Sequence, residues 1–464
     1  MARVRTSYRC SECGWTTGKW VGQCPDCGSW GTVEEGPAPV STPAPRHALA
    51  PATPARPIDQ IRPEDARARS TGLGELDRVL GGGIVPGAVI LLAGEPGVGK
   101  STLLLHVAAQ AARQAAREGR GPVMYLTGEE SAAQVRIRAD RISAVADNLL
   151  LASLTDVEGA LGHIHAHSPS LVVVDSVQTF ASAESSGAPG SVSQVRACAS
   201  AFIEVAKSTG VPIVLVGHVT KDGTIAGPRV LEHLVDVVCQ FEGDRHARLR
   251  LLRALKNRYG ATDEVGCFDL TDSGIIELPD PSGLFLEGAD AQVPGTCITI
   301  TLEGRRPMAL QMQALLAPSK MSNPRRATSG VSSPRVAMTL AVLQGRVGVP
   351  LADKDVYIST VGGASSSEPA VDVAVALAVA SAAADRVIPS DLVAIGEVGL
   401  NGQLRSVTGI ERRLTEAARL GFTTAIVPAS AARSARLPAS LTIHPVSSVR
   451  DAIARALRDG SDSR

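Results

Sequence analysis

The residues with the clearest chemical meaning lie in one short segment that combines glycines with a lysine and a serine. They follow the pattern GxxxxGK[ST] and comprise Gly94, Glu95, Pro96, Gly97, Val98, Gly99, Lys100, Ser101 and Thr102. Glycines let backbone N–H groups turn toward phosphate oxygens, and the start of a following helix adds a positive dipole end. Lys100 would reach the β- and γ-phosphates, and the Ser101 hydroxyl would bind Mg²⁺. The segment therefore predicts a site for ATP and Mg²⁺.

Acidic residues downstream of this segment could complete a hydrolytic site. The apolar run Leu171–Val174 ends in Asp175, the arrangement that holds magnesium in P-loop ATPases. Glu129 and Glu130 follow another apolar run that lies between the two motifs. A carboxylate at a strand end can polarise the attacking water as a general base. An acid at the start of a helix can instead be there because it interacts favourably with the helix dipole. We predict that Glu129 is the base, with Glu130 as the alternative.

Four cysteines are crowded into the first 27 residues as two CxxC pairs: Cys10, Cys13, Cys24 and Cys27. Four thiolates suit tetrahedral Zn²⁺ and leave no coordination position open for catalysis. The remaining cysteines are scattered through apolar surroundings, which predicts buried thiols: Cys198, Cys239, Cys267 and Cys297. We therefore predict one structural zinc at the N-terminus.

All three tryptophans, Trp15, Trp20 and Trp30, lie in this cysteine-rich segment. Their rings could form the small core of the module, or they could offer faces to nucleic-acid bases or to a protein partner. The sequence leaves these alternatives open. It also leaves open whether the module contacts DNA or protein.

Composition and periodicity divide the chain into four segments. Residues 1–35 form the four-cysteine zinc module, and residues 36–68 are a Pro/Ala-rich linker that cannot bury enough surface to fold. Residues 69–275 alternate short apolar runs with helical stretches, which predicts an α/β domain with a mostly parallel sheet. Residues 285–464 predict an α+β domain. The predicted elements are strands at 88–93, 123–127, 171–175, 211–217 and 297–302, and helices at 100–117, 192–209, 334–343, 368–383 and 410–420.

The bulk composition excludes some classes of protein. Lys+Arg and Asp+Glu both total 46 among the 464 residues, so a nucleic-acid surface would have to be a local patch. No apolar run approaches the about 20 residues of a membrane span. The N-terminal arginines have no apolar stretch behind them, as a signal peptide would require. We expect a cytoplasmic protein.

Together these motifs resemble the family of bacterial RadA (Sms) DNA repair proteins along nearly the whole chain. That family combines a four-cysteine zinc motif, a RecA-like ATPase core, a KNRFG-type pentapeptide and a C-terminal domain shaped like the Lon protease proteolytic domain. The pentapeptide here is KNRYG, residues 256–260, with Tyr259 in place of phenylalanine.

The resemblance implies a DNA-stimulated ATPase that binds single-stranded and branched DNA. Such a protein processes recombination intermediates and promotes branch migration with the RecA recombinase, as a homo-hexameric ring. In such rings the nucleotide lies between subunits, so Lys256 and Arg258 would act catalytically on the neighbour's ATP. By the same analogy Lys221, after a predicted core strand, would contact DNA.

The resemblance also places two substitutions at Lon catalytic positions. Ala370 lies where Lon proteases carry their nucleophilic serine, and Arg413 lies where the catalytic lysine would be. Alanine has no hydroxyl, and arginine does not lose its proton in practice. We therefore predict a Lon-like domain without peptidase activity.

Three other functions remain open. An ATP-dependent Lon-type protease is suggested by the C-terminal domain, and a KaiC-like signalling ATPase would share the core and the paired glutamates. A zinc-anchored scaffold in which ATP only locks a ring is the third.

Charge distribution adds one prediction that does not depend on the resemblance. No Asp or Glu occurs between Gly304 and Ala352, whereas seven cations do: Arg305, Arg306, Lys320, Arg325, Arg326, Arg335 and Arg346. We predict an uncompensated cationic strip that binds DNA phosphates, centred on Arg325 and Arg326. The alternative is that these cations are dispersed over a solvated surface.

Overall fold

A computed structural model describes residues 7–36, 57–218, 230–243, 248–286, 293–321, 323–361, 365–434 and 436–457. The chain divides into two compact units, Met1–Arg62 and Pro63–Arg464. Within the described part, no helix is long and apolar enough to cross a membrane.

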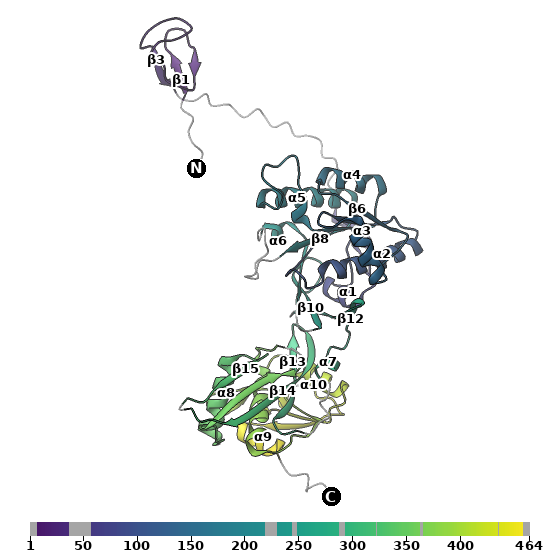
Figure 1. Ribbon diagram of the computed structural model, residues 1–464, viewed down its shortest axis with the longest axis vertical. Helices are drawn as coiled ribbons and strands as arrows, with labels where there is room; N and C mark the ends of the chain where they lie inside the picture. Colours follow the sequence, from purple (N-terminus) through teal and green to yellow (C-terminus); the bar gives the residue numbers. More distant parts are fainter. Residues whose placement is uncertain are drawn as a thin grey trace. The chain divides into compact units, whose positions relative to one another are not determined.

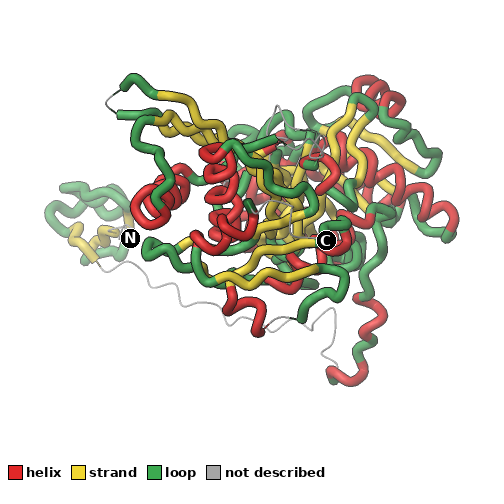
Figure 2. The backbone as a smooth tube through the Cα atoms, turned by 90° about the horizontal axis from the view of Figure 1, so that it is seen from below, coloured by secondary structure: helices red, strands yellow, loops and turns green. Residues whose placement is uncertain are grey.

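Residues 7–36 of the first unit consist of short strands and loops (Figure 2). The antiparallel sheet has the order β2-β1-β3, from Thr16–Thr17, Ser7–Cys10 and Val33–Gly36. A single 3-10 turn, Ile58–Gln60, occurs later in this unit. Trp15 packs on the small core, whereas Trp20 and Trp30 are 63% and 75% exposed. Of the two roles predicted for the tryptophans, the structure therefore gives the core role only to Trp15.

A nine-stranded sheet dominates the first half of the second unit, in the order β12-β11-β10-β9-β4-β8-β7-β5-β6 (Figure 1). Six neighbouring strands are parallel: β4 (Val89–Gly94), β5 (Val123–Thr127), β6 (Leu149–Ser153), β7 (Leu171–Asp175), β8 (Ile213–His218) and β9 (Val237–Glu242). An antiparallel extension follows at one edge: β10 (Leu249–Asn257), β11 (Val265–Thr271) and β12 (Gly274–Glu277). The predicted mostly parallel α/β core is confirmed.

Helices cover both faces of this sheet because the central strands are apolar on both sides. Along β4, Ile90 and Leu92 belong to one apolar cluster, and Val89 and Leu91 belong to another. The first cluster includes residues of α1 (Gly74–Leu80), α2 (Lys100–Arg117) and α3 (Ala132–Arg141). The second includes residues of α4 (Val157–His167), α5 (Val192–Thr209) and α6 (Val230–Leu234). Short 3-10 turns lie at Pro63–Ala66 and Val177–Thr179.

The C-terminal half is built on a seven-stranded mixed sheet in the order β15-β16-β14-β13-β17-β20-β21. Its strands are β13 (Thr296–Glu303), β14 (Arg306–Pro318), β15 (Arg326–Ser329), β16 (Lys354–Thr360), β17 (Leu392–Ala394), β20 (Thr424–Pro428) and β21 (Thr442–Val446). A small hairpin pairs β18 (Glu397–Val398) with β19 (Leu404–Arg405).

Helix α9 (Asp372–Ala384) is the buried centre of this domain; the helix predicted at 368–383 begins only at Asp372, because a 3-10 turn precedes it. It contacts strands β13 and β14, and also helices α8 (Ser333–Val342) and α12 (Val449–Ala456). The remaining helical segments are α7 (Ser282–Phe285), a π-turn at Leu343–Val347, a 3-10 turn at Pro369–Val371, α10 (Ile410–Arg419) and α11 (Ala429–Ser434). The predicted α+β domain is confirmed.

A buried ion pair links the two halves of the second unit. Arg306, at the start of β14, pairs with Glu75 of α1, and both side chains are almost fully buried. The Glu75 carboxylate also accepts a hydrogen bond from the backbone N–H of Cys267 at 2.9 Å. Removing one member of such a pair typically costs about 3–5 kcal/mol, because the other charge is left buried and unpaired. The pair therefore ties the first hairpin of the C-terminal domain to the domain built on the nine-stranded sheet.

Candidate active site and zinc centre

The glycine-rich loop lies at the carboxyl end of β4, where ligands bind in open parallel α/β sheets. Gly97 and Gly99 have φ values of +86° and +105°, a region that side chains rarely adopt. A Cβ on Gly94 would lie 2.4 Å from the carbonyl oxygen of Phe241 on β9. These positions therefore require glycine for backbone geometry as well as for the approach of phosphate.

Lys100, the first residue of α2, is buried at 4% exposure under this loop. Its Nζ donates to the carbonyl oxygens of Gly94 at 2.8 Å and Glu95 at 2.9 Å. Burial lowers the pKa of Lys100, while the charges of Asp175 and Glu129 act in the opposite direction. The structure thus brings the predicted lysine and both predicted carboxylates into one electrostatic cluster.

Each carboxylate accepts a hydrogen bond from a hydroxyl that the sequence analysis did not single out. Tyr125 Oη donates to Asp175 Oδ2 at 2.5 Å, and Ser176 Oγ donates to Glu129 Oε1 at 2.6 Å. Burial, and then the charge of Asp175, raise the pKa of Tyr125 well above its usual value, so the phenol remains a donor. A tyrosine within an otherwise aliphatic strand was the available sequence signal.

Glu130 is oriented differently from Glu129. Its carboxylate forms an ion pair with Arg138 of α3, and its backbone N–H donates to Thr127 Oγ1 at 3.2 Å. Ser131 then caps α3 in a capping box with Gln134. The structure therefore places Glu130 in the helix entry and Glu129 beside Lys100 and Ser176.

Arg250 is a third residue that the sequence analysis missed. It lies on β10, is 2% exposed, and donates from Nε to the carbonyl oxygen of Val98 in the glycine-rich loop at 3.1 Å. The available sequence signal was an arginine on the strand face that also carries Leu252 and Ala254. Its bond ties the antiparallel extension of the sheet to the glycine-rich loop.

The oxygen donors at this site fit Mg²⁺. Magnesium takes one or two protein oxygens and completes its shell with phosphates and water. Asp175 is buried at the end of β7 beside Lys100, and the Ser101 hydroxyl lies on the next residue of α2. Asp175 and Ser101 are therefore the residues that would hold the ion.

The four cysteines of the first unit converge as predicted. Their Sγ atoms all lie within 4.8 Å of one another, with Cys10 and Cys27 at 3.7 Å and Cys13 and Cys24 at 3.6 Å. Tetrahedral zinc with Zn–S bonds of about 2.3 Å requires sulfur separations of about 3.8 Å, so the set fits the ion. Positive φ values at Gly14 and Gly28 close the two knuckles. No other group of metal-binding side chains occurs among the described residues.

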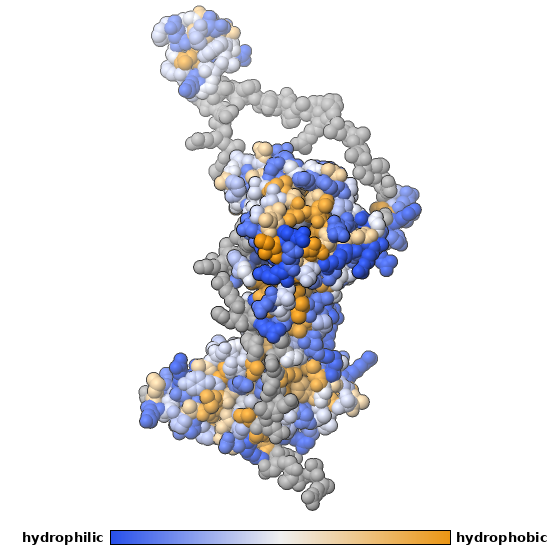
Figure 3. Space-filling view, turned by 45° about the vertical axis from the view of Figure 1, so that its right-hand side comes forward, coloured by the Kyte–Doolittle hydropathy of each residue, from blue (hydrophilic) through white to orange (hydrophobic). Residues whose placement is uncertain are grey.

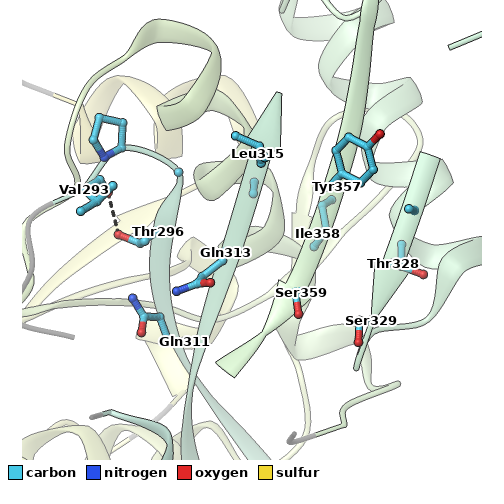
Figure 4. Close-up of a pocket in the computed structure, with 14 residues that line it drawn as sticks. Val293, Thr296, Gln311, Gln313, Leu315, Thr328, Ser329, Tyr357, Ile358 and Ser359 are labelled. Carbon is cyan, nitrogen blue, oxygen red and sulfur yellow. Dashed lines mark hydrogen bonds between the residues drawn. The ribbon is translucent and has the colours of Figure 1, made fainter. Parts of the chain in front are cut away.

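A cavity of about 560 Å³ opens on the sheet of the C-terminal domain, away from the glycine-rich loop (Figure 4). The labelled side chains lie on strands β13 to β16 and the segment before them. They are polar or apolar, and none of the residues lining the cavity is charged. The cavity therefore lacks the cations that a phosphate site would need.

Comparison with known proteins covers each part of the chain. Residues 8–35 match a rubredoxin metal-binding domain, residues 54–224 an AAA domain, and residues 343–459 the Lon protease (S16) C-terminal proteolytic domain. The chain is 52% identical over 460 residues to a DNA repair protein RadA from Mycolicibacterium smegmatis, covering 97% of both chains. It is 43% identical to the RadA of Bacillus subtilis, covering 98% of this chain and 100% of the relative. The chain belongs to the RadA family.

The RadA pentapeptide does not meet the glycine-rich loop of its own chain. Asn257 pairs with Val237, which pairs with Ile90 near the amino end of β4, whereas the loop follows the carboxyl end. Lys256 Nζ donates to the carbonyl oxygens of Glu232 and Val235, both at 2.8 Å. Arg258 Nη1 lies 3.2 Å from Asp236 Oδ1. Both cations therefore lie level with the amino ends of the parallel strands, whereas the glycine-rich loop follows their carboxyl ends.

The two Lon-like positions of this RadA-family chain are buried. Ala370 is fully buried, and Arg413 is 1% exposed. The Arg413 guanidinium binds both oxygens of Glu368, at 2.8 and 2.6 Å, and donates to Ile300 O at 2.7 Å. The arginine at the lysine position is thus fully occupied in an internal ion pair.

The prediction of an uncompensated cationic strip is wrong for three of its seven members. Arg306 pairs with Glu75, Arg335 lies 2.6 Å from Asp372, and Arg305 lies 3.6 Å from Asp263. The acidic partners come from other elements of the fold, so a segment without acids of its own is still neutralised by residues that are distant in sequence.

The predicted DNA contacts differ in how far the structure describes them. Arg325 and Arg326 are exposed, but Asp355 accepts a hydrogen bond from the Arg325 N–H at 2.7 Å. The Arg326 guanidinium donates to the carbonyl oxygen of Leu351 at 2.9 Å. Lys221 lies outside the described residues.

We expect this RadA-family chain to carry one zinc per molecule, and Cys24→Ala to abolish it. Structural zinc in small modules contributes about 10–16 kcal/mol of apparent binding free energy, so the variant should unfold residues 1–35. Metal analysis and proteolysis check this, with Cys198→Ala as the control because that thiol is buried in the ATPase core. A full zinc complement in Cys24→Ala would contradict the assignment.

Proposed function

We propose that this chain is a DNA-stimulated ATPase that processes recombination intermediates and promotes branch migration alongside the RecA recombinase. The supporting observation is the cluster of Lys100, Asp175 and Glu129 at one edge of the sheet, in a chain of the RadA family. DNA that is single-stranded or branched is the proposed substrate, and a homo-hexameric ring is the proposed assembly.

The residues of the cluster divide the work of hydrolysis. Backbone N–H groups of residues 94–102 cradle the phosphates, and Lys100 stabilises the charge that develops on the γ-phosphoryl group. Asp175 and Ser101 would hold Mg²⁺, which would supply positive charge to neutralise the phosphates. Glu129 orients the attacking water and accepts its proton.

Lys256 and Arg258 are proposed to complete this site from a neighbouring subunit. Their distance from the chain's own glycine-rich loop, across the length of β4, supports action in trans. Leu255, which precedes Lys256, is 52% exposed, and apolar side chains are exposed on both halves of the second unit (Figure 3). Exposed apolar patches are typical of surfaces that associate.

The C-terminal domain is proposed to have no peptidase activity and to support DNA binding. Without a hydroxyl at Ala370 and with Arg413 held by Glu368, the site has neither a nucleophile nor a base. Arg325 and Arg326 remain its proposed phosphate contacts because both are exposed.

Lys100→Ala should abolish ATP hydrolysis, because the variant loses the buried ammonium that is proposed to stabilise the charge on the γ-phosphoryl group. Glu129→Gln should still bind ATP but turn over about 10²–10⁴-fold more slowly, the usual contribution of a general base. ATPase rates with and without single-stranded DNA check both, with Glu130→Gln as the matched control. Absence of DNA stimulation in the unmodified protein would instead favour a signalling ATPase.

Mixing Lys256→Ala subunits with Lys100→Ala subunits should restore part of the ATPase activity that each variant lacks alone. A mixed ring contains interfaces where an intact loop faces an intact pentapeptide. Activity across mixing ratios measures the effect, and mass measurement in ATP gives the ring size. If no ratio restores activity, Lys256 acts within its own chain.

Reversing both exposed arginines, Arg325→Glu with Arg326→Glu, should weaken DNA binding similarly for all sequences. The slope of log affinity against log salt should fall by about 0.7 for each phosphate of a single strand that the variant no longer binds. Arg305→Glu, at an arginine that already lies near acids, is the control. An unchanged salt slope in the double variant would mean that the two arginines are only solvated surface.

A further inference from the structure

A reciprocal pair of hydrogen bonds, each from a hydroxyl to a carboxylate, links two neighbouring parallel strands at the candidate active site. Strand β5 carries Tyr125 and is followed by Glu129, while β7 ends in Asp175 and is followed by Ser176. The tyrosine of the first strand donates to the acid of the second, and the serine after the second donates to the acid after the first. The register pairs Thr127 directly with Asp175.

We propose that Tyr125 and Ser176 form a reciprocal brace that assigns the two carboxylates to different tasks. Tyr125 positions Asp175 as the magnesium ligand, and Ser176 positions Glu129 toward the attacking water. Both are positioning residues, and the inference rests on the proposed ATPase function.

Burial makes the two hydroxyls specific in their action. Tyr125 and Ser176 are both fully buried, so neither side chain exchanges its hydrogen bond with bulk water. The bond from Tyr125 occupies Oδ2 of Asp175, which leaves Oδ1 as the oxygen available to a cation. A carboxylate restrained in this way presents one oxygen in a fixed direction, as the partners of metal ligands generally do.

The brace also keeps the two acids from exchanging roles. Both carboxylates interact electrostatically with Lys100, so either one could be drawn toward the ammonium or the ion. Holding Glu129 through Ser176 at 2.6 Å restrains it on the β7 side. Glu130 does not take either role because its carboxylate is held in an ion pair with Arg138.

Two single-hydroxyl deletions should therefore separate magnesium binding from chemistry. Tyr125→Phe should raise the Mg²⁺ concentration needed for half-maximal binding of a fluorescent, non-hydrolysable ATP analogue by about 10-fold or more. Binding of the analogue in EDTA should not change. Tyr357→Phe, at a tyrosine in the C-terminal domain, is the matched control.

Ser176→Ala should lower kcat by about 10²-fold, the usual cost of a small misplacement of a reacting group, while the Mg²⁺ dependence of analogue binding stays as in the unmodified protein. Ser176→Thr, which keeps a hydroxyl, should recover most of the activity. Ser170→Ala, just before the opposite end of β7, is the control.

The outcomes separate this inference from the proposed function. If Asp175→Asn shifts the Mg²⁺ dependence but Tyr125→Phe does not, the tyrosine half of the brace is overturned. If Glu129→Gln stops turnover but Ser176→Ala has normal kcat, the serine half is overturned. A drop in melting temperature with equal changes in both readouts would reduce both residues to structural roles. Normal behaviour of Asp175→Asn and Glu129→Gln would instead overturn the proposed function itself.

Discussion

The buried ammonium of Lys100 is the interaction on which the ATPase core depends. Burial disfavours its charge, and the carbonyls of Gly94 and Glu95 together with the charges of Asp175 and Glu129 compensate. These groups come from the ends of three strands, β4, β5 and β7. The sheet must therefore bring those ends to one edge, and the parallel arrangement of β4, β8, β7 and β5 does so. The groups that compensate the charge of Lys100 thus define the end of the sheet at which ATP can bind.

The same requirement explains why hydroxyls line this edge. Carboxylates gathered around one cation repel each other, and each needs a donor to hold it where it is useful. Tyr125 and Ser176 supply these donors from adjacent strands. On the far side, Arg250 ties the loop backbone to β10, whose other end carries the pentapeptide. Strand β10 therefore contacts the glycine-rich loop near its first residue and carries Lys256 near its last.

The sequence could predict what is local and could not predict what folding brings together. Helices α2 and α5 and strands β5 and β7 have the predicted bounds, since apolar periodicity and glycine positions depend only on neighbouring residues. The four cysteines were predictable because zinc requires their spacing. The hydrogen bond from Tyr125 to Asp175 could not be predicted, because it depends on which strands become neighbours in the sheet. The same limit produced the error over the cationic strip, where Arg306 meets Glu75 from 231 positions away.

The ion pair between Arg413 and Glu368 has an evolutionary consequence. A serine introduced at position 370 alone would not supply a peptidase base, because the Arg413 guanidinium does not lose its proton and already pairs with Glu368. Replacing Arg413 with lysine would lose a bidentate pair between a buried arginine and a partly buried glutamate, at a cost in stability. Substitutions at positions 368 and 413 are therefore coupled, because changing either residue alone leaves the charge of the other without its full partner.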